Sequence, residues 1–99
     1  MNTPIRERAI LGPGSRPALP RHVRLHFDRV RDRTALLSPE KILWPDETSL
    51  EILTRCDGSR TITDIARELA AEYDAPAEDI ELDVIDFVQE WSDRMLVRI

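Results

Sequence analysis

The sequence predicts an α+β fold in which an N-terminal three-stranded antiparallel sheet is followed by three helices, in the order of a winged helix-turn-helix. Two observations support this prediction. Between residues 22 and 44 apolar side chains alternate with polar ones, as in half-buried strands. From residue 46 onward apolar side chains recur at helical spacing instead. A chain of 99 residues has room for one modest core, so we expect a single domain over residues 22–99.

The first 21 residues differ in composition from the rest of the chain. They hold four of the seven prolines and two of the three glycines. Because proline fixes its φ angle and lacks a backbone donor, we expect residues 1–21 to form a flexible arm. A second interpretation is that Ile5, Ile10 and Leu11 pack on another copy of the chain or on a partner. A homodimer formed through the arm is therefore left open.

The first two strands are predicted to form an antiparallel hairpin. Residues 22–28 alternate with a period of two, and residues 34–38 supply the returning strand. His22 and His26 fall on the polar face of the first strand. Since no third ligand is near them in the sequence, we expect both histidines to face solvent rather than a metal ion.

A short third strand is predicted at residues 41–44, between Pro39 and Pro45. Proline cannot donate to a β ladder, so a strand bounded by two prolines is expected at an edge of the sheet. An open edge is able to accept an extended peptide as an additional strand.

The helical half begins at Asp46, a good N-cap. We expect the first helix to end at Asp57-Gly58, with Gly58 in the left-handed conformation. Thr61 and Asp64 resemble a capping box that starts the second helix. Cys56, at an apolar helical position, is expected to be a small core residue rather than a reactive thiol.

Charge is distributed unevenly along the chain. Residues 1–45 carry nine Lys or Arg and four Asp or Glu, a net charge of +5, whereas residues 46–99 carry five and fifteen, a net charge of −10. The predicted third helix, residues 76–94, has seven acidic residues and one arginine. Such a helix would repel the phosphate backbone of DNA. A winged-helix DNA-binding regulator is therefore a weaker alternative, as is a purely structural dimerisation module.

Sequence signatures of catalysis are missing. The chain has no GxxxxGKS/T loop, no GxGxxG turn and no GxSxG elbow, and its single cysteine has no cysteine partner for a metal. We expect no enzyme activity, no cofactor and no metal. The sequence also lacks a long apolar run and a signal-peptide pattern, so we expect a cytoplasmic protein without a membrane partner.

Three stretches carry a resemblance to a known family. They are ALLSPEKILWPDETSLEIL, CDGSRTITDIARELAAEYDAP and EDIELDVIDFVQEW. In combination, residues 34–98 resemble the PqqD family of pyrroloquinoline quinone (PQQ) biosynthesis, a family of peptide-recognition domains (RiPP recognition elements). The chain departs from the family pattern at Pro45-Asp46, where an apolar residue followed by Asn is expected.

The resemblance implies a domain that does no chemistry of its own. Such a domain binds the leader of a ribosomally made, PqqA-like precursor peptide and presents it to a PqqE-like radical SAM enzyme. It also implies that the peptide lies along the third strand and the third helix. On this sequence the implied peptide-binding residues are Lys41, Ile42, Leu43, Trp44, Leu82, Asp83, Ile85, Asp86 and Gln89.

Overall fold

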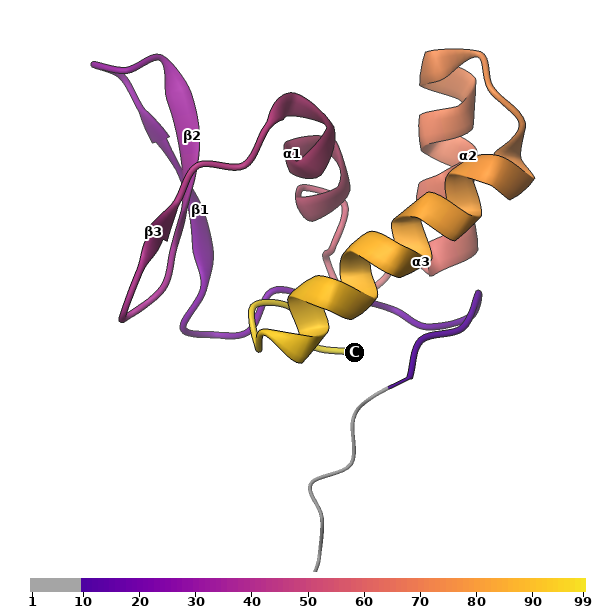
Figure 1. Cartoon of the computed structure of the whole chain (residues 1–99), viewed down its shortest axis with the longest axis horizontal. Helices are drawn as coiled ribbons and strands as arrows, with labels where there is room; N and C mark the ends of the chain where they lie inside the picture. Colours follow the sequence, from indigo (N-terminus) through magenta and orange to yellow (C-terminus); the bar gives the residue numbers. More distant parts are fainter. Residues whose placement is uncertain (1–9) are drawn as a thin grey trace, which may run out of the picture.

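The computed structural model describes residues 10–99, so Ile5 and the rest of the first nine residues lie outside it. Three antiparallel strands precede three helices (Figure 1), and the predicted α+β fold is confirmed. The elements are β1 Arg24–Asp28, β2 Arg33–Leu37, β3 Ile42–Leu43, α1 Glu47–Leu53, α2 Ile62–Tyr73 and α3 Ala77–Asp93. None of the described helices is long and apolar enough to cross a membrane.

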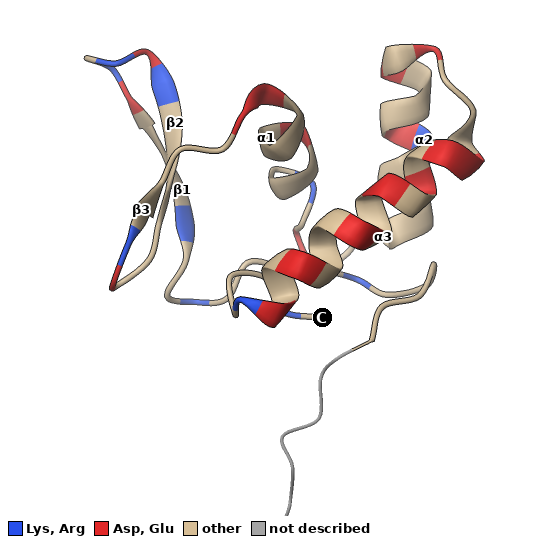
Figure 2. Cartoon of the chain, in the orientation of Figure 1, with Lys and Arg blue, Asp and Glu red and all other residues tan. Residues whose placement is uncertain are grey.

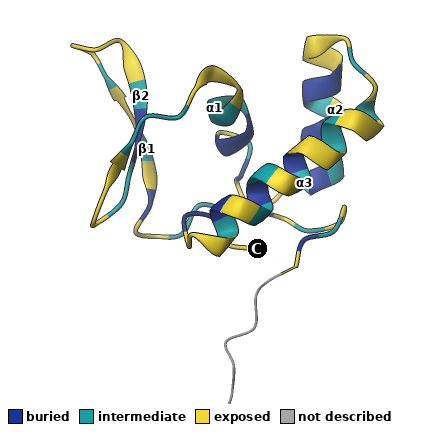
Figure 3. Cartoon of the chain, in the orientation of Figure 1, coloured by how far each residue is buried: buried dark blue, intermediate teal, exposed yellow. Residues whose placement is uncertain are grey.

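The sheet has the strand order β1-β2-β3, so β3 lies at an edge, as its two flanking prolines predicted. Leu25 pairs with Leu36, and Leu36 pairs with Leu43. This row of leucines packs on the core. Phe27, the next side chain on the same face of β1, is not part of the core, since it is 51% exposed. The hairpin extends beyond the helices there (Figures 1 and 3), so its apolar face has little to pack against.

Both predicted helix starts are confirmed. The Asp46 carboxylate accepts a hydrogen bond of 2.8 Å from the backbone N–H of Ser49. At α2, Thr61 and Asp64 each accept a bond from the backbone of the other, which completes the capping box. These bonds satisfy N–H groups that have no partner within the helix.

The predicted end of α1 was wrong. The helix stops at Leu53 with Thr54 as its C-cap, and Gly58 lies in the loop that follows, with a φ angle of +82°. Gly58 adopts the left-handed conformation there to donate its N–H to the Pro17 carbonyl at 2.9 Å. Cys56 is buried in the core, as expected for a packing residue.

The core lies between the inner face of the sheet and the three helices (Figure 3). Its largest fully buried side chains come from the N-terminal segment, β2, every helix and the C-terminal segment: Pro17, Leu36, Leu53, Ile62, Ile65, Val84, Val88 and Val97. Since α2 and α3 pack against each other and the sheet packs on the same cluster, the core fixes the position of α3 relative to the strands.

The described part of the predicted arm is bonded to the domain over residues 11–18. The carbonyls of Pro13, Ser15 and Pro17 accept backbone hydrogen bonds of 2.9–3.1 Å from the loop before α2 and from its first residues. Ala18 exchanges two bonds of 2.8 Å with Arg98, so the C-terminal segment pairs with this region rather than with the sheet. Proline lacks a donor but keeps its carbonyl acceptor, which allows a proline-rich segment to bind in this way.

Candidate functional site

The open edge of the sheet is formed by β3, and a tight turn holds this strand in place. Ser38 donates its backbone N–H to the Lys41 carbonyl at 3.0 Å, and the Ser38 hydroxyl bonds to the same residue. In an antiparallel ladder, hydrogen-bonded and non-hydrogen-bonded pairs alternate. The next pair, Leu37 with Ile42, is therefore non-hydrogen-bonded, and the backbone N–H and C=O of Ile42 point away from β2. Within residues 10–99 no strand pairs with that side of β3.

The side chains of the edge strand divide between two environments. Lys41 is exposed and Ile42 is 60% exposed, whereas Leu43 is half-buried and packs on the core. Trp44 is half-buried. The guanidinium carbons of Arg31 and Arg33 lie 5.4 and 5.3 Å from its ring centroid. The edge therefore offers backbone groups for pairing and apolar side chains on both faces.

The five residues predicted on α3 do not share one environment. Leu82 is 64% exposed and lines a hollow of about 410 Å³ together with Thr63 and Arg67 of α2. Ile85 is half-buried against the core, and Asp83 and Asp86 are exposed. Gln89 accepts a hydrogen bond of 3.1 Å from the backbone N–H of Leu11, so the chain itself uses this side chain.

The contact between Leu11 and Gln89 distinguishes the two flanks of α3. Residues advance about 100° around an α-helix, so Gln89 and Ile85 lie on the flank next to the N-terminal segment. In Figure 1 this segment lies on one side of α3, and the sheet and α1 lie beyond the other. We infer that the flank of α3 nearer the sheet consists of the residues at the opposite helical positions, Asp83, Phe87, Glu90 and Arg94.

Phe87, which the sequence-based site does not include, also lies on the sheet-facing flank of α3. It is half-buried and stacks on Trp91 with ring centroids 5.1 Å apart, and Arg94 lies over the same tryptophan at 5.3 Å. The sequence places Phe87 on the apolar face of α3, where it is indistinguishable from a core residue. Only its four-residue spacing from Asp83 associates it with the sheet-facing flank.

The exposed surface of α3 is strongly acidic (Figure 2). The acids of α1 and α2 are largely paired, because Glu51, Glu68 and Glu72 form ion pairs with Arg55. Asp83 and Asp86 form no ion pair within residues 10–99. Their charges are thus available to a basic group on a partner.

No metal site is found in the described part of the chain. Residues 10–99 contain no group of three or more His, Cys, Asp or Glu side chains that could hold a metal ion. His22, which precedes β1, and His26, which lies on it, are both exposed, as predicted.

Comparison with known proteins relates the chain to one family. The chain is 45% identical to a PqqA binding protein of Bradyrhizobium diazoefficiens over 80 residues, which cover 81% of this chain and 78% of that protein. It is 47% identical to a PqqA binding protein of Xanthomonas oryzae pv. oryzae, covering 84% and 90% of the two chains. The solution structure of the PqqD part of Methylobacterium extorquens PqqCD, described as a functional and stand-alone RiPP recognition element, is 34% identical. It superposes with a TM-score of 0.75 over 93% of this chain and 97% of that one. Because the model of coenzyme PQQ synthesis protein D also matches residues 33–97, the chain belongs to the PqqD family.

Proposed function

We propose that this chain is a non-catalytic peptide-binding protein of PQQ biosynthesis that binds a PqqA-like precursor peptide and presents it to a PqqE-like radical SAM enzyme. The open edge of β3 is the observation that supports the binding mode, since the backbone groups of Ile42 face away from the sheet. Family membership supports the choice of peptide, because relatives that are 45% and 47% identical to this chain are named PqqA binding proteins. We place this binding in the cytoplasm, where the precursor is synthesised.

In the proposed complex the leader extends the sheet as a fourth strand beside β3. Its backbone exchanges hydrogen bonds with Ile42, and its side chains alternate between the two faces of the sheet. Those on the inner face meet the sheet-facing flank of α3, where Phe87 offers an apolar contact and Asp83 attracts a basic or hydrogen-bonding group. The chain contributes affinity and position, and the chemistry belongs to the enzyme.

The binding mode is tested by removing one backbone donor from the open edge. Ile42→Pro deletes the outward N–H without removing a bond to β2, whereas Ile42→Val keeps the N–H and the side-chain class. We expect Ile42→Pro to weaken binding of the precursor peptide by about tenfold or more, in line with the loss of a backbone hydrogen bond and of strand geometry. Ile42→Val is expected to stay within about twofold, because it removes only one methylene group from a side chain that is 60% exposed.

Titration of the fluorescently labelled peptide, followed by anisotropy, gives both dissociation constants. Equal affinities of the two variants would exclude strand addition at β3. A wild-type protein that does not saturate with the peptide would exclude peptide binding itself. Far-UV circular dichroism of Ile42→Pro establishes that the variant is folded.

A further inference from the structure

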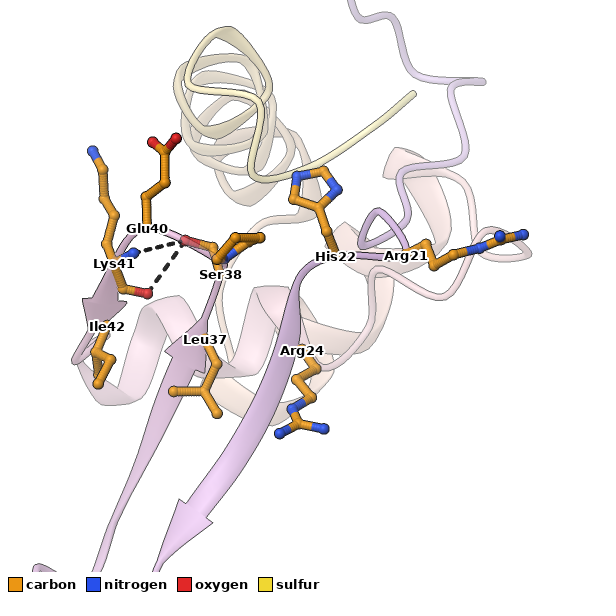
Figure 4. A pocket seen from close by; sticks show the side chains of 9 residues that line it. Arg21, His22, Arg24, Leu37, Ser38, Glu40, Lys41 and Ile42 are labelled. Carbon is orange, nitrogen blue, oxygen red and sulfur yellow. Dashed lines mark hydrogen bonds between the residues drawn. The ribbon is translucent and has the colours of Figure 1, made fainter.

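The sheet has a second face that points away from the core. The leucines of the inner row, Leu25, Leu36 and Leu43, pack on the helices, so their neighbours along each strand project to the opposite side. Arg24 pairs with Leu37, and Leu37 pairs with Ile42. Figure 4 shows these three side chains on the same side of the sheet. All three helices lie on the other side (Figure 1), so no described helix covers this face.

This outer sheet face has an apolar centre and a basic surround. We define it by the outward side chains of the three strands and the adjoining turn: Arg24, His26, Asp28, Arg31, Arg33, Ala35, Leu37, Ile42 and Trp44. Leu37 and Trp44 are half-buried and Ile42 is mostly exposed. A hollow of about 820 Å³ continues the face beyond the end of β1, and Arg21, His22 and Lys41 are among the residues that line it (Figure 4).

The positive charge of this face is only partly neutralised by the chain. Arg31 forms an ion pair with Asp28 at 2.9 Å. Arg24 and Arg33 form no ion pair within residues 10–99. The face is therefore basic on a protein whose net charge is −5 (Figure 2). Charges of this kind steer association with a surface of opposite sign.

The residue types favour a protein as the occupant. Arginine and tryptophan are enriched in the centres of protein–protein interfaces. The guanidinium groups of Arg31 and Arg33 both lie over the Trp44 ring, at 5.4 and 5.3 Å from its centroid, so contacts within the chain already restrain the ring. A purely electrostatic surface for nucleic acid or anionic lipid needs no apolar centre of this kind.

We propose that the outer sheet face is the docking surface for an acidic patch on the enzyme that receives the peptide, an inference that rests on the proposed function. A peptide added at β3 lies in the plane of the sheet and leaves this face open. Its outward side chains extend the row of Arg24, Leu37 and Ile42, so the enzyme meets carrier and peptide on one continuous surface. The enzyme thereby distinguishes the loaded carrier from the empty one.

Charge reversal on this face separates enzyme docking from peptide binding. The double variant Arg21→Glu, Arg24→Glu lies just before β1 and at its first residue, at the edge of the sheet opposite β3. Arg67→Glu is the control for charge reversal elsewhere on the surface, because Arg67 is exposed on α2 and forms no ion pair within the described residues. The probe is the purified radical SAM enzyme of the same organism, titrated by calorimetry with and without the precursor peptide.

We expect the double variant to bind the enzyme about tenfold or more weakly and to bind the peptide within about twofold of wild type, as expected for a charged rim remote from the peptide. Arg67→Glu should change neither affinity. Enzyme affinity that is unchanged in the double variant, or that falls equally in Arg67→Glu, would overturn the proposal. A different partner would also overturn it. In that case the double variant would keep its affinity for the enzyme but lose binding to duplex DNA, to anionic phospholipid vesicles or to a second copy of the chain.

Two further measurements keep the result interpretable. Circular dichroism reports whether the double variant folds, and if it does not, Arg24→Ala replaces it with a smaller expected loss of about threefold in enzyme affinity. A wild-type chain that binds the enzyme through this face but not the peptide would refute the proposed function and leave the docking surface standing. A wild-type chain that does not bind the enzyme refutes the docking surface itself.

Discussion

Leu11 and Gln89, 78 positions apart in the sequence, are joined by a hydrogen bond of 3.1 Å from the backbone N–H of Leu11 to Oε1 of Gln89. The amide nitrogen of Gln89 donates in turn to Asp93 at 3.0 Å, which fixes the orientation of the side chain. Leu11 itself is 8% exposed and belongs to the core cluster. The N-terminal segment thus occupies one flank of α3, and an incoming peptide has the sheet-facing flank available to it.

Truncating Leu11 should therefore destabilise the whole domain. We expect Leu11→Ala to lower the free energy of unfolding by about 2 kcal/mol, the low end of the cost of removing a buried leucine, because the site lies near the surface and is able to relax. Urea unfolding, followed by tryptophan fluorescence, measures the change. Ile10→Ala is the control, since Ile10 is 73% exposed and its truncation should cost less than about 0.5 kcal/mol. Equal stability of the two variants would mean that the segment is not held to the domain in solution.

The same segment shows what the sequence could and could not predict. Strands, caps and the edge position of β3 follow from local signals, such as the prolines around residues 41–44 and the side-chain oxygens of Asp46 and Thr61. Residues 11–18 are held to the domain by carbonyls that accept hydrogen bonds from backbone N–H groups more than 40 positions away in the sequence. No local sequence pattern predicts such contacts. The end of α1 was misplaced because a left-handed glycine is typical of a helix end, whereas the left-handed Gly58 belongs here to the following loop, where its N–H donates to the Pro17 carbonyl.

The predicted peptide-binding residues were harder still to derive. Helical periodicity tells which residues of α3 are exposed, but not which flank faces β3. That distinction comes from the bond between Gln89 and Leu11 and from the position of Leu82 beside α2. The sequence pattern alone does not single out Phe87, because an aromatic residue at that spacing satisfies the same pattern whether it packs inward or lines a groove.

The two flanks of α3 should differ in their effect on peptide affinity. We expect Asp83→Lys to weaken binding of the precursor peptide by about fivefold, because it replaces an attractive charge with a repulsive one on the sheet-facing flank. Leu82→Ala should change the affinity by less than about twofold, as a peripheral contact does, since Leu82 lines the hollow shared with α2. Anisotropy titrations at two salt concentrations measure both effects. A larger loss for Leu82→Ala than for Asp83→Lys would place the peptide on the other flank.

The helix caps should make stability fall in acid. The hydrogen bond from the backbone N–H of Thr61 lowers the pKa of Asp64 below its usual 3.8, and the bond from the Ser49 backbone does the same for Asp46. A carboxylate with a lowered pKa stabilises the fold above its unfolded value and loses that contribution as the pH falls through the folded pKa. We therefore expect the free energy of unfolding to decline below about pH 4.

The acid effect is isolated by comparing wild type with Asp64→Asn from pH 7 to pH 2.5. Asparagine retains a cap acceptor but does not titrate, so the stability difference between the two proteins should shrink as the pH drops below about 4. Thermal unfolding at each pH supplies the comparison. A difference that stays constant over this range would show that the Asp64 carboxylate has an ordinary pKa.

Cys56 should be unreactive in the native protein. Burial, followed by the negative charge of Asp57, raises the pKa of its thiol to about 12, and Sγ donates to the Ile52 carbonyl at 3.3 Å. At pH 8 the thiolate fraction is then on the order of one in ten thousand, and only the thiolate is a nucleophile. We expect Ellman's reagent to label the folded protein at the rate of transient opening, and to label one thiol at once in 6 M guanidinium.

The raised pKa of the Cys56 thiol also favours the folded state below about pH 9, and this contribution should be lost as the pH rises toward 12. Complete labelling of the folded protein within seconds would show that Cys56 is accessible, and that the loop between α1 and α2 opens more readily than its bonds to Pro17 and Ala18 imply.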